Sequence, residues 1–364
     1  MIADDLTGAL DASAPFAQRG IRAAIQLDPA VPADDLPADL GLLCINTASR
    51  ELPEDEACRR VAAAAATLDR FRPDIVFKKI DSRTKGHVVA ESRVVAAATG
   101  RSTVLFCPAI PDLGRTVWDQ CLFGVGVDKP LPLRPLATAI AVAAEIPQAA
   151  TQADLDAAAR LLTARPEATL AVGARGLAAS LATLLGPAAP DAAGLPFRPR
   201  LPLVFAIGSR DPITIAQSDR LTKAADVMAI KAPNGHLADG PWSAGLTLIR
   251  VVAGDEPEDG RTVAERFTTA LADKLYTQTP RCLLVSGGEV AQSLLRALDV
   301  RWIEVLGEAL PGVPFMQLRI GGREVTVMTK SGGFGDPETL ARLANACATA
   351  DPERDPPFVQ ALFQ

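Results

Sequence analysis

The chain has 364 residues, of which 48% are hydrophobic and 22% charged, a composition that excludes a disordered or fibrous protein. This length predicts two domains. The formal net charge of −6 gives no overall attraction to nucleic acid or to an anionic membrane, so any anion must be held by local groups. No stretch approaches the roughly 20 apolar residues of a membrane span. We therefore expect neither a nucleic-acid partner nor a membrane.

The spacing of cysteines and histidines indicates whether the chain holds a structural metal or disulfides, and disulfide content in turn indicates the cellular compartment. The six cysteines lie far apart without a C-x-x-C pair, and the chain has two histidines. This pattern predicts neither a structural zinc site nor a disulfide framework. Residues 1–5 carry acids where a secretory leader would carry bases. We therefore expect a cytoplasmic protein.

Short runs of Val, Ile and Leu alternate with alanine-rich runs along the first half of the chain. This alternation predicts βα units and a largely parallel sheet, hence an α/β fold. Residues that favour helix ends mark the limits of the helices. Thr151, for example, is expected to cap a helix. The expected strands are 23–27, 40–45, 75–80, 102–107 and 169–172, and the expected helices are 11–18, 53–69 and 152–164.

A proline-rich segment follows the first half. Residues 186–202 read GPAAPDAAGLPFRPRLP, with five prolines and two glycines before an apolar run. We place the domain boundary there, which gives domains 1–200 and 201–364. In the second half the expected strands are 203–207, 246–252, 282–285 and 325–328, the last preceded by a hairpin around Gly321 and Gly322. The expected helices are 213–225, 262–276, 290–298 and 337–350, followed by a loosely held tail, 351–364.

Three strands of the second half run into turns rich in glycine. Strand 282–285 is followed by SGGE, strand 325–328 by TKSGGFG and strand 203–207 by Gly208 and Ser209. Glycines between a strand and a helix let backbone amides approach an anion, so the turns predict a phosphate site that Lys330 would strengthen. The simpler alternative is that each glycine pair only turns the chain. Neither a Walker A motif nor a G-x-G-x-x-G motif is present.

Carboxylates gather at the start of the chain. The sequence IADDLTGALD puts Asp4, Asp5, Thr7 and Asp11 around a turn at Gly8. Adjacent aspartates repel each other unless they bind hydroxyls, a cation or basic side chains, which favours a binding role. The alternative for one of the pair, Asp5, is a helix cap.

Cations and a carboxylate mix in the sequence KKIDSRTKGH after strand 75–80. A small acid with several hydroxyls would need this mixture, because Lys79 or Arg83 could neutralise its carboxylate while Asp81 and Ser82 bind hydroxyls. A solvated run of charges is the alternative. The segment CPAIPDLGRTV adds Arg115, which could reach an anionic ligand.

These segments resemble the four-carbon acid sugar kinase family over nearly the whole chain. The motifs IADDLTGALD, KKIDSRTKG, CPAIPDLGRTV, GSRDPITIAQ, VSGGEVA, PGVP and TKSGGFGDPETL stand in the family's order and at similar spacing. The resemblance implies an N-terminal sugar-acid domain, a C-terminal nucleotide domain and an active-site cleft between them. The implied reaction is ATP-dependent phosphorylation of the terminal hydroxyl of threonate, erythronate or a 3-oxo-tetronate, with Mg²⁺ neutralising the phosphates.

The resemblance also implies roles for individual residues. Asp81 or Asp5 would orient the hydroxyl and accept its proton. The implied sugar-acid residues are Asp4, Thr7, Asp11, Lys79, Ser82, Arg83 and Arg115. The implied ATP-binding residues are Ser209, Gly287, Gly288, Glu289, Val290, Lys330, Gly332, Gly333, Phe334 and Gly335.

This chain departs from the family at one loop. The family usually reads D-S-T-x-R-G-N, whereas here Arg83 replaces the threonine, Lys85 the arginine and His87 the asparagine. The preferred acid is therefore expected to differ from the usual one. The same departures leave open an alternative function, a non-catalytic sugar-acid-binding relative of such kinases. A homo-oligomer is also left open.

Overall fold

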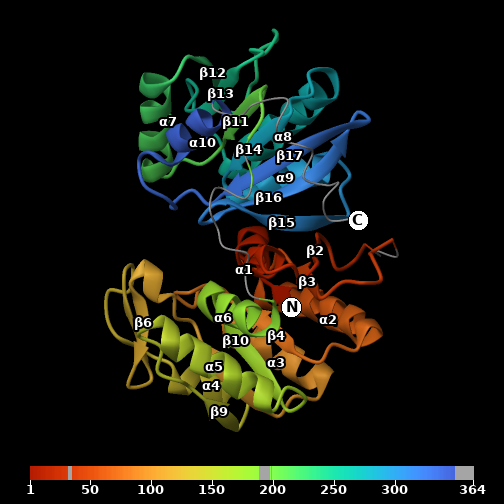
Figure 1. The fold of residues 1–364 in the computed structure, drawn as a ribbon, viewed down its shortest axis with the longest axis vertical. Helices are drawn as coiled ribbons and strands as arrows, with labels where there is room; N and C mark the ends of the chain where they lie inside the picture. Colours follow the sequence, from red (N-terminus) through yellow and green to blue (C-terminus); the bar gives the residue numbers. More distant parts are fainter. Residues whose placement is uncertain (32–34, 188–196, 198, 349–364) are drawn as a thin grey trace. The chain divides into compact units, whose positions relative to one another are not determined.

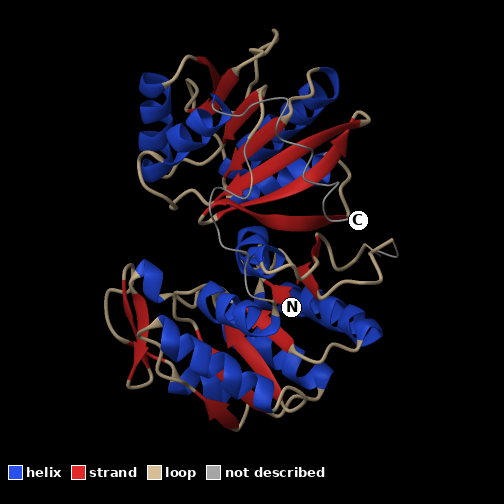
Figure 2. Cartoon of the chain, viewed as in Figure 1, coloured by secondary structure: helices blue, strands red, loops and turns tan. Residues whose placement is uncertain are grey.

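The computed structural model describes residues 1–31, 35–187, 197 and 199–348 (Figure 1). The chain divides into two compact units. The first unit comprises residues 1–190 and 301–305, and the second comprises residues 191–300 and 306–364. Each unit alternates strands with helices along the chain (Figure 2).

The first unit is built on parallel strands in the order β2-β3-β1-β4-β10-β5-β9. Residues 302–305 pair antiparallel with β2. A separate antiparallel sheet has the order β6-β7-β8. The bounds are β1 (Ile2–Ala3), β2 (Ala23–Gln26), β3 (Leu42–Asn46), β4 (Val76–Lys79), β5 (Thr103–Cys107), β6 (Arg115–Trp118), β7 (Cys121–Gly124), β8 (Leu131–Pro132), β9 (Ala143–Glu145) and β10 (Thr169–Gly173).

Two groups of helices pack on this sheet. Helix α6 contacts α1 and α5, and helix α3 contacts α2 and α4. The strands between them are buried along nearly their whole length, as expected for a parallel sheet covered on both faces. The bounds are α1 (Leu6–Gln18), α2 (Glu54–Phe71), α3 (Val88–Thr99), η1 (Pro111–Leu113), α4 (Arg134–Ile140), α5 (Gln152–Ala164) and α6 (Arg175–Leu185).

The second unit has parallel strands in the order β12-β13-β11-β14-β17, followed by β16 and β15. Strand β16 is antiparallel to β17. Helices α7 and α10 contact each other, as do α8 and α9. The bounds are β11 (Leu203–Ile207), α7 (Pro212–Ala224), β12 (Val227–Pro233), β13 (Leu246–Val252), α8 (Gly260–Thr277), β14 (Cys282–Ser286), α9 (Gly288–Ala297), β15 (Trp302–Leu310), β16 (Val313–Ile320), β17 (Arg323–Lys330) and α10 (Thr339–Ala348).

The α/β class expected from the sequence is confirmed, and many elements lie where the sequence predicts them. Strands β11 and β13 and helix α5 have the predicted bounds, Thr151 caps α5, and the hairpin at Gly321 and Gly322 joins β16 to β17. The helix expected from residue 11 begins instead at Leu6, because the Asp5 side chain accepts a bond from the Gly8 amide and caps the helix earlier. Most of the boundary segment 186–202 and the whole tail 351–364 lie outside the described residues.

Strand register sets where functional loops can meet. In the first unit, Ala3, Asn46, Lys79 and Gly173 are aligned at the carboxyl ends of neighbouring strands. In the second unit, Ser286 is aligned with Ile207 and with Lys330. The turns that follow these strands therefore meet at the sheet edge where α/β proteins bind their ligands.

Candidate functional site

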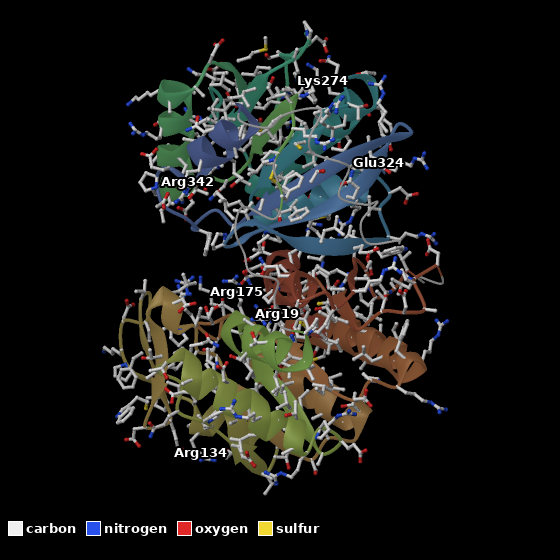
Figure 3. All side chains as sticks on the ribbon, in the orientation of Figure 1. Arg19, Arg134, Arg175, Lys274, Glu324 and Arg342 are labelled. Atoms are coloured by element: carbon white, nitrogen blue, oxygen red, sulfur yellow. The ribbon has the colours of Figure 1, made fainter. Side chains whose placement is uncertain are left out.

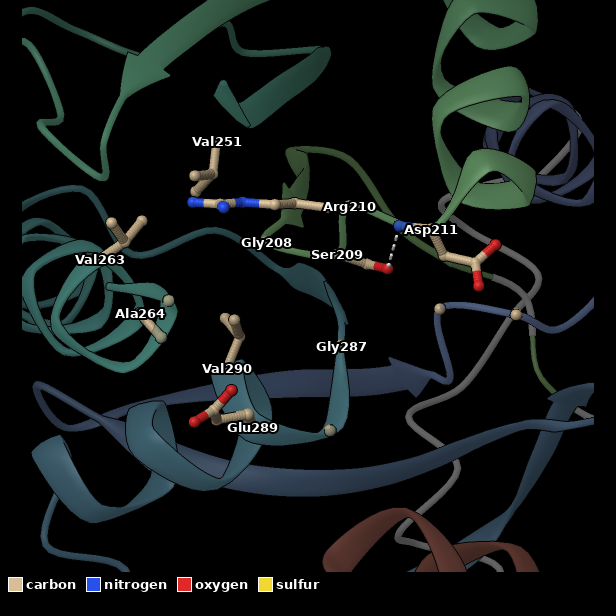
Figure 4. A pocket seen from close by; sticks show the side chains of 14 residues that line it. Gly208, Ser209, Arg210, Asp211, Val251, Val263, Ala264, Gly287, Glu289 and Val290 are labelled. Atoms are coloured by element: carbon tan, nitrogen blue, oxygen red, sulfur yellow. Dashed lines mark hydrogen bonds between the residues drawn. The ribbon is translucent and has the colours of Figure 1, made fainter. Parts of the chain in front are cut away.

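A cavity of about 440 Å³ lies at the carboxyl ends of β11, β14 and β17 in the second unit (Figure 4). Apolar side chains and polar or glycine-rich turns both contribute to its wall. The lining residues are Gly208, Ser209, Arg210, Asp211, Val251, Gly260, Val263, Ala264, Gly287, Gly288, Glu289, Val290, Gly332 and Gly333. The predicted nucleotide residues among them come from three separate turns and share one cavity.

The turns at the cavity pack too closely for larger side chains. A Cβ on Gly332 would lie 2.2 Å from Ser209 Oγ, and a Cβ on Gly208 would lie 2.3 Å from Val290 Cγ2. Backbone bonds tie the turns together, since Ser209 N donates to Ser286 O and Gly287 N donates to Lys330 O. The two glycines thus leave room for the Ser209 and Val290 side chains of the facing turns.

The start of α9 leaves backbone amides available. Gly287 occupies the cap position with φ of 111°, and no side chain accepts from the first amides of the helix. By contrast, Asp211 caps α7 and Asp259 caps α8. An uncapped helix start that lines a cavity suits an anion, because the amides and the helix dipole attract negative charge.

Three predicted nucleotide residues lie outside the lining of this cavity: Lys330, Phe334 and Gly335. The Lys330 ammonium is turned into the following loop, where it donates to Ser331 O at 2.8 Å, Phe334 O at 3.0 Å and Thr214 Oγ1 at 3.0 Å. The Phe334 ring packs where a Cβ on Gly312 would stand. Lys330 therefore fixes the shape of the loop, whereas the sequence predicted that it would contact phosphate.

The Lys330 environment predicts a pH effect on stability. Burial lowers the pKa of this lysine to about 8, from the 10.5 of a free side chain. Between these two pH values the unfolded chain holds the proton that the folded chain has lost, so the free energy of unfolding rises with pH. Denaturant unfolding should therefore show that the free energy of unfolding of the parent protein rises between pH 8 and 10 relative to that of a Lys330→Met variant. Parallel pH curves for the two proteins would contradict this assignment.

In the first unit, the paired aspartates both bind an arginine that was not among the predicted site residues. Arg50 donates to Asp4 Oδ1 at 2.8 Å and Oδ2 at 2.9 Å, and to both oxygens of Asp5 at 2.9 Å. Burial alone would raise the pKa of Asp4, yet Lys78 and Arg50 hold it below its ordinary value. Burial raises the pKa of Asp5 even though Arg50 opposes the shift. Asp5 also caps α1, so its oxygens are occupied.

The other predicted residues of α1 and β4 lie beside this pair. Asp11 faces Arg175, which is labelled in Figure 3, with 3.0 Å between Asp11 Oδ1 and Arg175 Nε. Burial raises the pKa of Asp11, and Arg175 opposes it. Lys79 Nζ donates to Ile80 O at 2.9 Å and acts electrostatically on Asp4, Asp5 and Asp11. Thr7 is half-buried on α1.

A buried ion pair lies next to these aspartates. Lys78 Nζ lies 2.8 Å from Glu91 Oε2, and the two side chains are 0% and 1% exposed. Ser49 Oγ donates to the other oxygen of Glu91 at 2.6 Å. Lys78 also acts electrostatically on Asp4, so the pair links α3 to the start of the chain.

Replacing Glu91 by alanine should destabilise the first unit strongly. The change leaves a buried ammonium without its counter-ion, which costs about 3–5 kcal/mol. Denaturant unfolding measures the loss. The double variant Lys78→Met/Glu91→Leu should recover most of it, and a single variant as stable as the parent protein would contradict the role given to the pair.

The loop after β4 is ordered around Asp81. Asp81 Oδ1 accepts from Arg83 N at 2.8 Å and, more weakly, from Lys85 N at 3.4 Å. Ser82 Oγ accepts from Arg115 Nη1 at 3.0 Å. Asp81 is half-buried, and its second oxygen accepts no bond from the described residues. The loop thus keeps one carboxylate oxygen free for a ligand.

Sequence reasoning missed the partners of these residues. Arg50, Glu91 and Arg175 carry the ion pairs of the first unit, and Arg210 lines the cavity of the second. Arg210 stands in the motif GSRDPITIAQ, and Arg50 closely follows a predicted strand. Their places after strand ends could have indicated them, whereas Glu91 lies inside a helix and gives no such signal.

No helix in the described ranges is both long enough and apolar enough to cross a membrane. Across the same residues, no group of three or more His, Cys, Asp or Glu side chains is arranged to hold a metal ion.

Two family models match separate parts of the chain. A family model described as a sugar-binding N-terminal domain matches residues 1–139, and one described as a nucleotide-binding C-terminal domain matches residues 250–340. A D-threonate kinase of Bordetella bronchiseptica is 28% identical, with 95% of this chain and 96% of that enzyme covered. A 3-oxo-tetronate kinase of Brucella melitensis is also 28% identical, with 92% of each chain covered.

A solved structure extends the likeness to the fold. The crystal structure of Haemophilus influenzae protein HI1011 superposes with a TM-score of 0.72 at 19% identity. The match covers 94% of this chain and 98% of that protein. At this identity the likeness concerns the fold alone.

Proposed function

Because the chain belongs to the family of four-carbon acid sugar kinases, which are phosphotransferases with an alcohol as acceptor, we propose that it phosphorylates the terminal hydroxyl of a four-carbon sugar acid and takes the phosphoryl group from ATP. Threonate, erythronate and the 3-oxo-tetronates are the candidate acids. The observation that supports ATP most strongly is the cavity at the uncapped start of α9.

The two domains have separate tasks in this proposal. The domain assigned to residues 1–200 binds the acid, and the domain assigned to residues 201–364 binds ATP. Val251, Val263 and Ala264 form an apolar part of the cavity wall suited to the base (Figure 4). The amides at the start of α9 and in the Gly332–Gly333 turn suit the phosphates, because backbone donors and a helix start both favour anions.

The cavity also fits a hard cation bound together with ATP. Two carboxylates line it, Asp211 and Glu289. One oxygen of Asp211 accepts a hydrogen bond from the Ile213 amide. Mg²⁺ usually takes one or two carboxylates along with phosphate oxygens and water. The two side chains point apart in Figure 4, so one of them, Asp211 or Glu289, would hold the ion together with phosphate oxygens, and the ion would neutralise the charge that develops on the transferred group.

On the acid side, we propose that Asp81 orients the hydroxyl and accepts its proton. Its free oxygen is the supporting observation, whereas the oxygens of the other candidate, Asp5, are taken by Arg50 and by the cap of α1. Asp5 then acts by keeping Arg50 in place. Asp4, Thr7, Asp11, Lys79 and Ser82 complete the proposed surface for hydroxyls.

A coupled assay of ADP release tests the proposal. The panel comprises D- and L-threonate, D- and L-erythronate and the 3-oxo acids, with threitol and erythritol as neutral controls. We expect release of ADP that depends on one or more acids and on added Mg²⁺. Binding of an acid without ADP release across the whole panel would overturn the kinase proposal and favour the non-catalytic alternative.

A further inference from the structure

Two arginines of the first unit stand side by side against one turn. Arg115 Nε donates to Val125 O at 2.9 Å. The next residue, Gly126, is covered by the Arg83 side chain, since a Cβ on Gly126 would lie 3.1 Å from both Cδ and Nη1 of Arg83. Both guanidinium groups therefore lie along the turn that follows β7.

These two arginines differ from three other cations of the first unit. Arg50 is paired with Asp4 and Asp5, Lys78 with Glu91, and Arg175 with Asp11. No carboxylate of the described residues forms an ion pair with Arg83 or Arg115, and the Arg83 guanidinium donates no hydrogen bond within that part of the chain. Two like charges have thus been brought together, and within the described residues no carboxylate is in ion-pair contact with either of them.

Holding the two charges together has an electrostatic cost. Burial, and then the neighbouring Arg83, lower the pKa of Arg115. Repulsion of this kind is relieved when an anion binds between the groups. A carboxylate is the anion whose two oxygens match the planar fork of a guanidinium.

The arginines also lie next to the groups proposed to bind hydroxyls. Ser82 accepts from Arg115, and Asp81 interacts electrostatically with both Arg115 and Arg50. A Cβ on Gly86, in the same loop, would lie 3.4 Å from Asp4 Oδ2. One loop therefore joins the cationic pair to the aspartates.

We propose that Arg83 and Arg115 form the subsite that binds the carboxylate of the acid, and that Arg83 makes the site select acids over neutral polyols. This inference rests on the proposed function, because it names the part of the same site that recognises the acid group. The two guanidinium groups bind the carboxylate end of the acid. The terminal hydroxyl at the other end is left for Asp81.

The test measures binding to the full-length protein by calorimetry, without ATP. The probes are the four tetronate isomers and their neutral counterparts, threitol and erythritol. The variant Arg83→Thr should bind an acid roughly 10- to 100-fold more weakly, the range expected for lost charge-assisted hydrogen bonds. Its affinity for the polyol should change by less than about twofold. Arg115→Gln should behave in the same way.

Lys129→Ala is the matched control, because it removes a charge from the segment that follows β7, at an exposed position. It should leave binding of the acid unchanged. The inference is overturned if Arg83→Thr binds the acid as the parent protein does, if Lys129→Ala loses as much affinity, if acid and polyol weaken equally, or if no acid binds the parent protein. If the parent protein binds the acid through Arg83 but releases no ADP, only the kinase proposal is contradicted.

Discussion

Replacing Asp81 by asparagine is expected to lower kcat by a factor of roughly 10² to 10⁴, the usual contribution of a general base. Asparagine preserves the acceptor oxygen that orders the loop through the Arg83 amide, so the fold should remain intact. It cannot take the proton from the hydroxyl. The affinity for ATP, measured by calorimetry, should therefore be unchanged while steady-state turnover collapses.

The control for this variant is Asp74→Asn. Asp74 is exposed and precedes β4 at its amino end, whereas Asp81 follows its carboxyl end. Turnover of the control should match that of the parent protein. If Asp81→Asn keeps normal turnover, Asp81 is removed from the role of base, and the role passes to Asp5.

Replacing Gly332 by alanine is expected to weaken ATP binding at least tenfold. The new Cβ would lie 2.2 Å from Ser209 Oγ and 3.2 Å from Asp211 Cβ, so the Ser209 hydroxyl must turn away, its bond from the Asp211 amide is lost and the two turns become crowded. Such overpacking also costs about 1–3 kcal/mol of stability. Nucleotide titration of the variant, at a temperature where it is folded, measures the loss of affinity, and KM for the acid should change little.

Gly245→Ala is the matched control for the glycine variant. A Cβ at Gly245 meets only Ser243 Oγ, at 3.5 Å, an ordinary contact, and the residue is not part of the cavity lining. ATP affinity of the control should equal that of the parent protein. Equal ATP binding by Gly332→Ala would show that the turns at the cavity do not hold the nucleotide.

The sequence predicted the loops because their signal is local. The runs GS, SGGE and SGGFG follow apolar strands directly, and parallel register then brings their first residues to one edge. The α/β class was readable for the same reason, from strands and helices that alternate along the chain. In the described residues, the predicted turns do meet at a cavity.

The ion-pair partners of the site residues could not be predicted from local sequence. Arg50 is 46 residues from Asp4, and Glu91 is 13 residues from Lys78 in a different element, so only the folded chain pairs them. Lys330 was expected at phosphate because it precedes a glycine loop. Its direction is set by carbonyl oxygens of that loop, which converge on one point only once the loop is folded.

The most direct measurement is a crystal structure of the full-length protein with a non-hydrolysable ATP analogue and the acid that supports ADP release. We predict phosphate oxygens at the amides of Gly288 and Glu289, and the carboxylate of the acid at Arg83 and Arg115. A nucleotide bound away from the α9 start, or an acid whose carboxylate avoids both arginines, would contradict it.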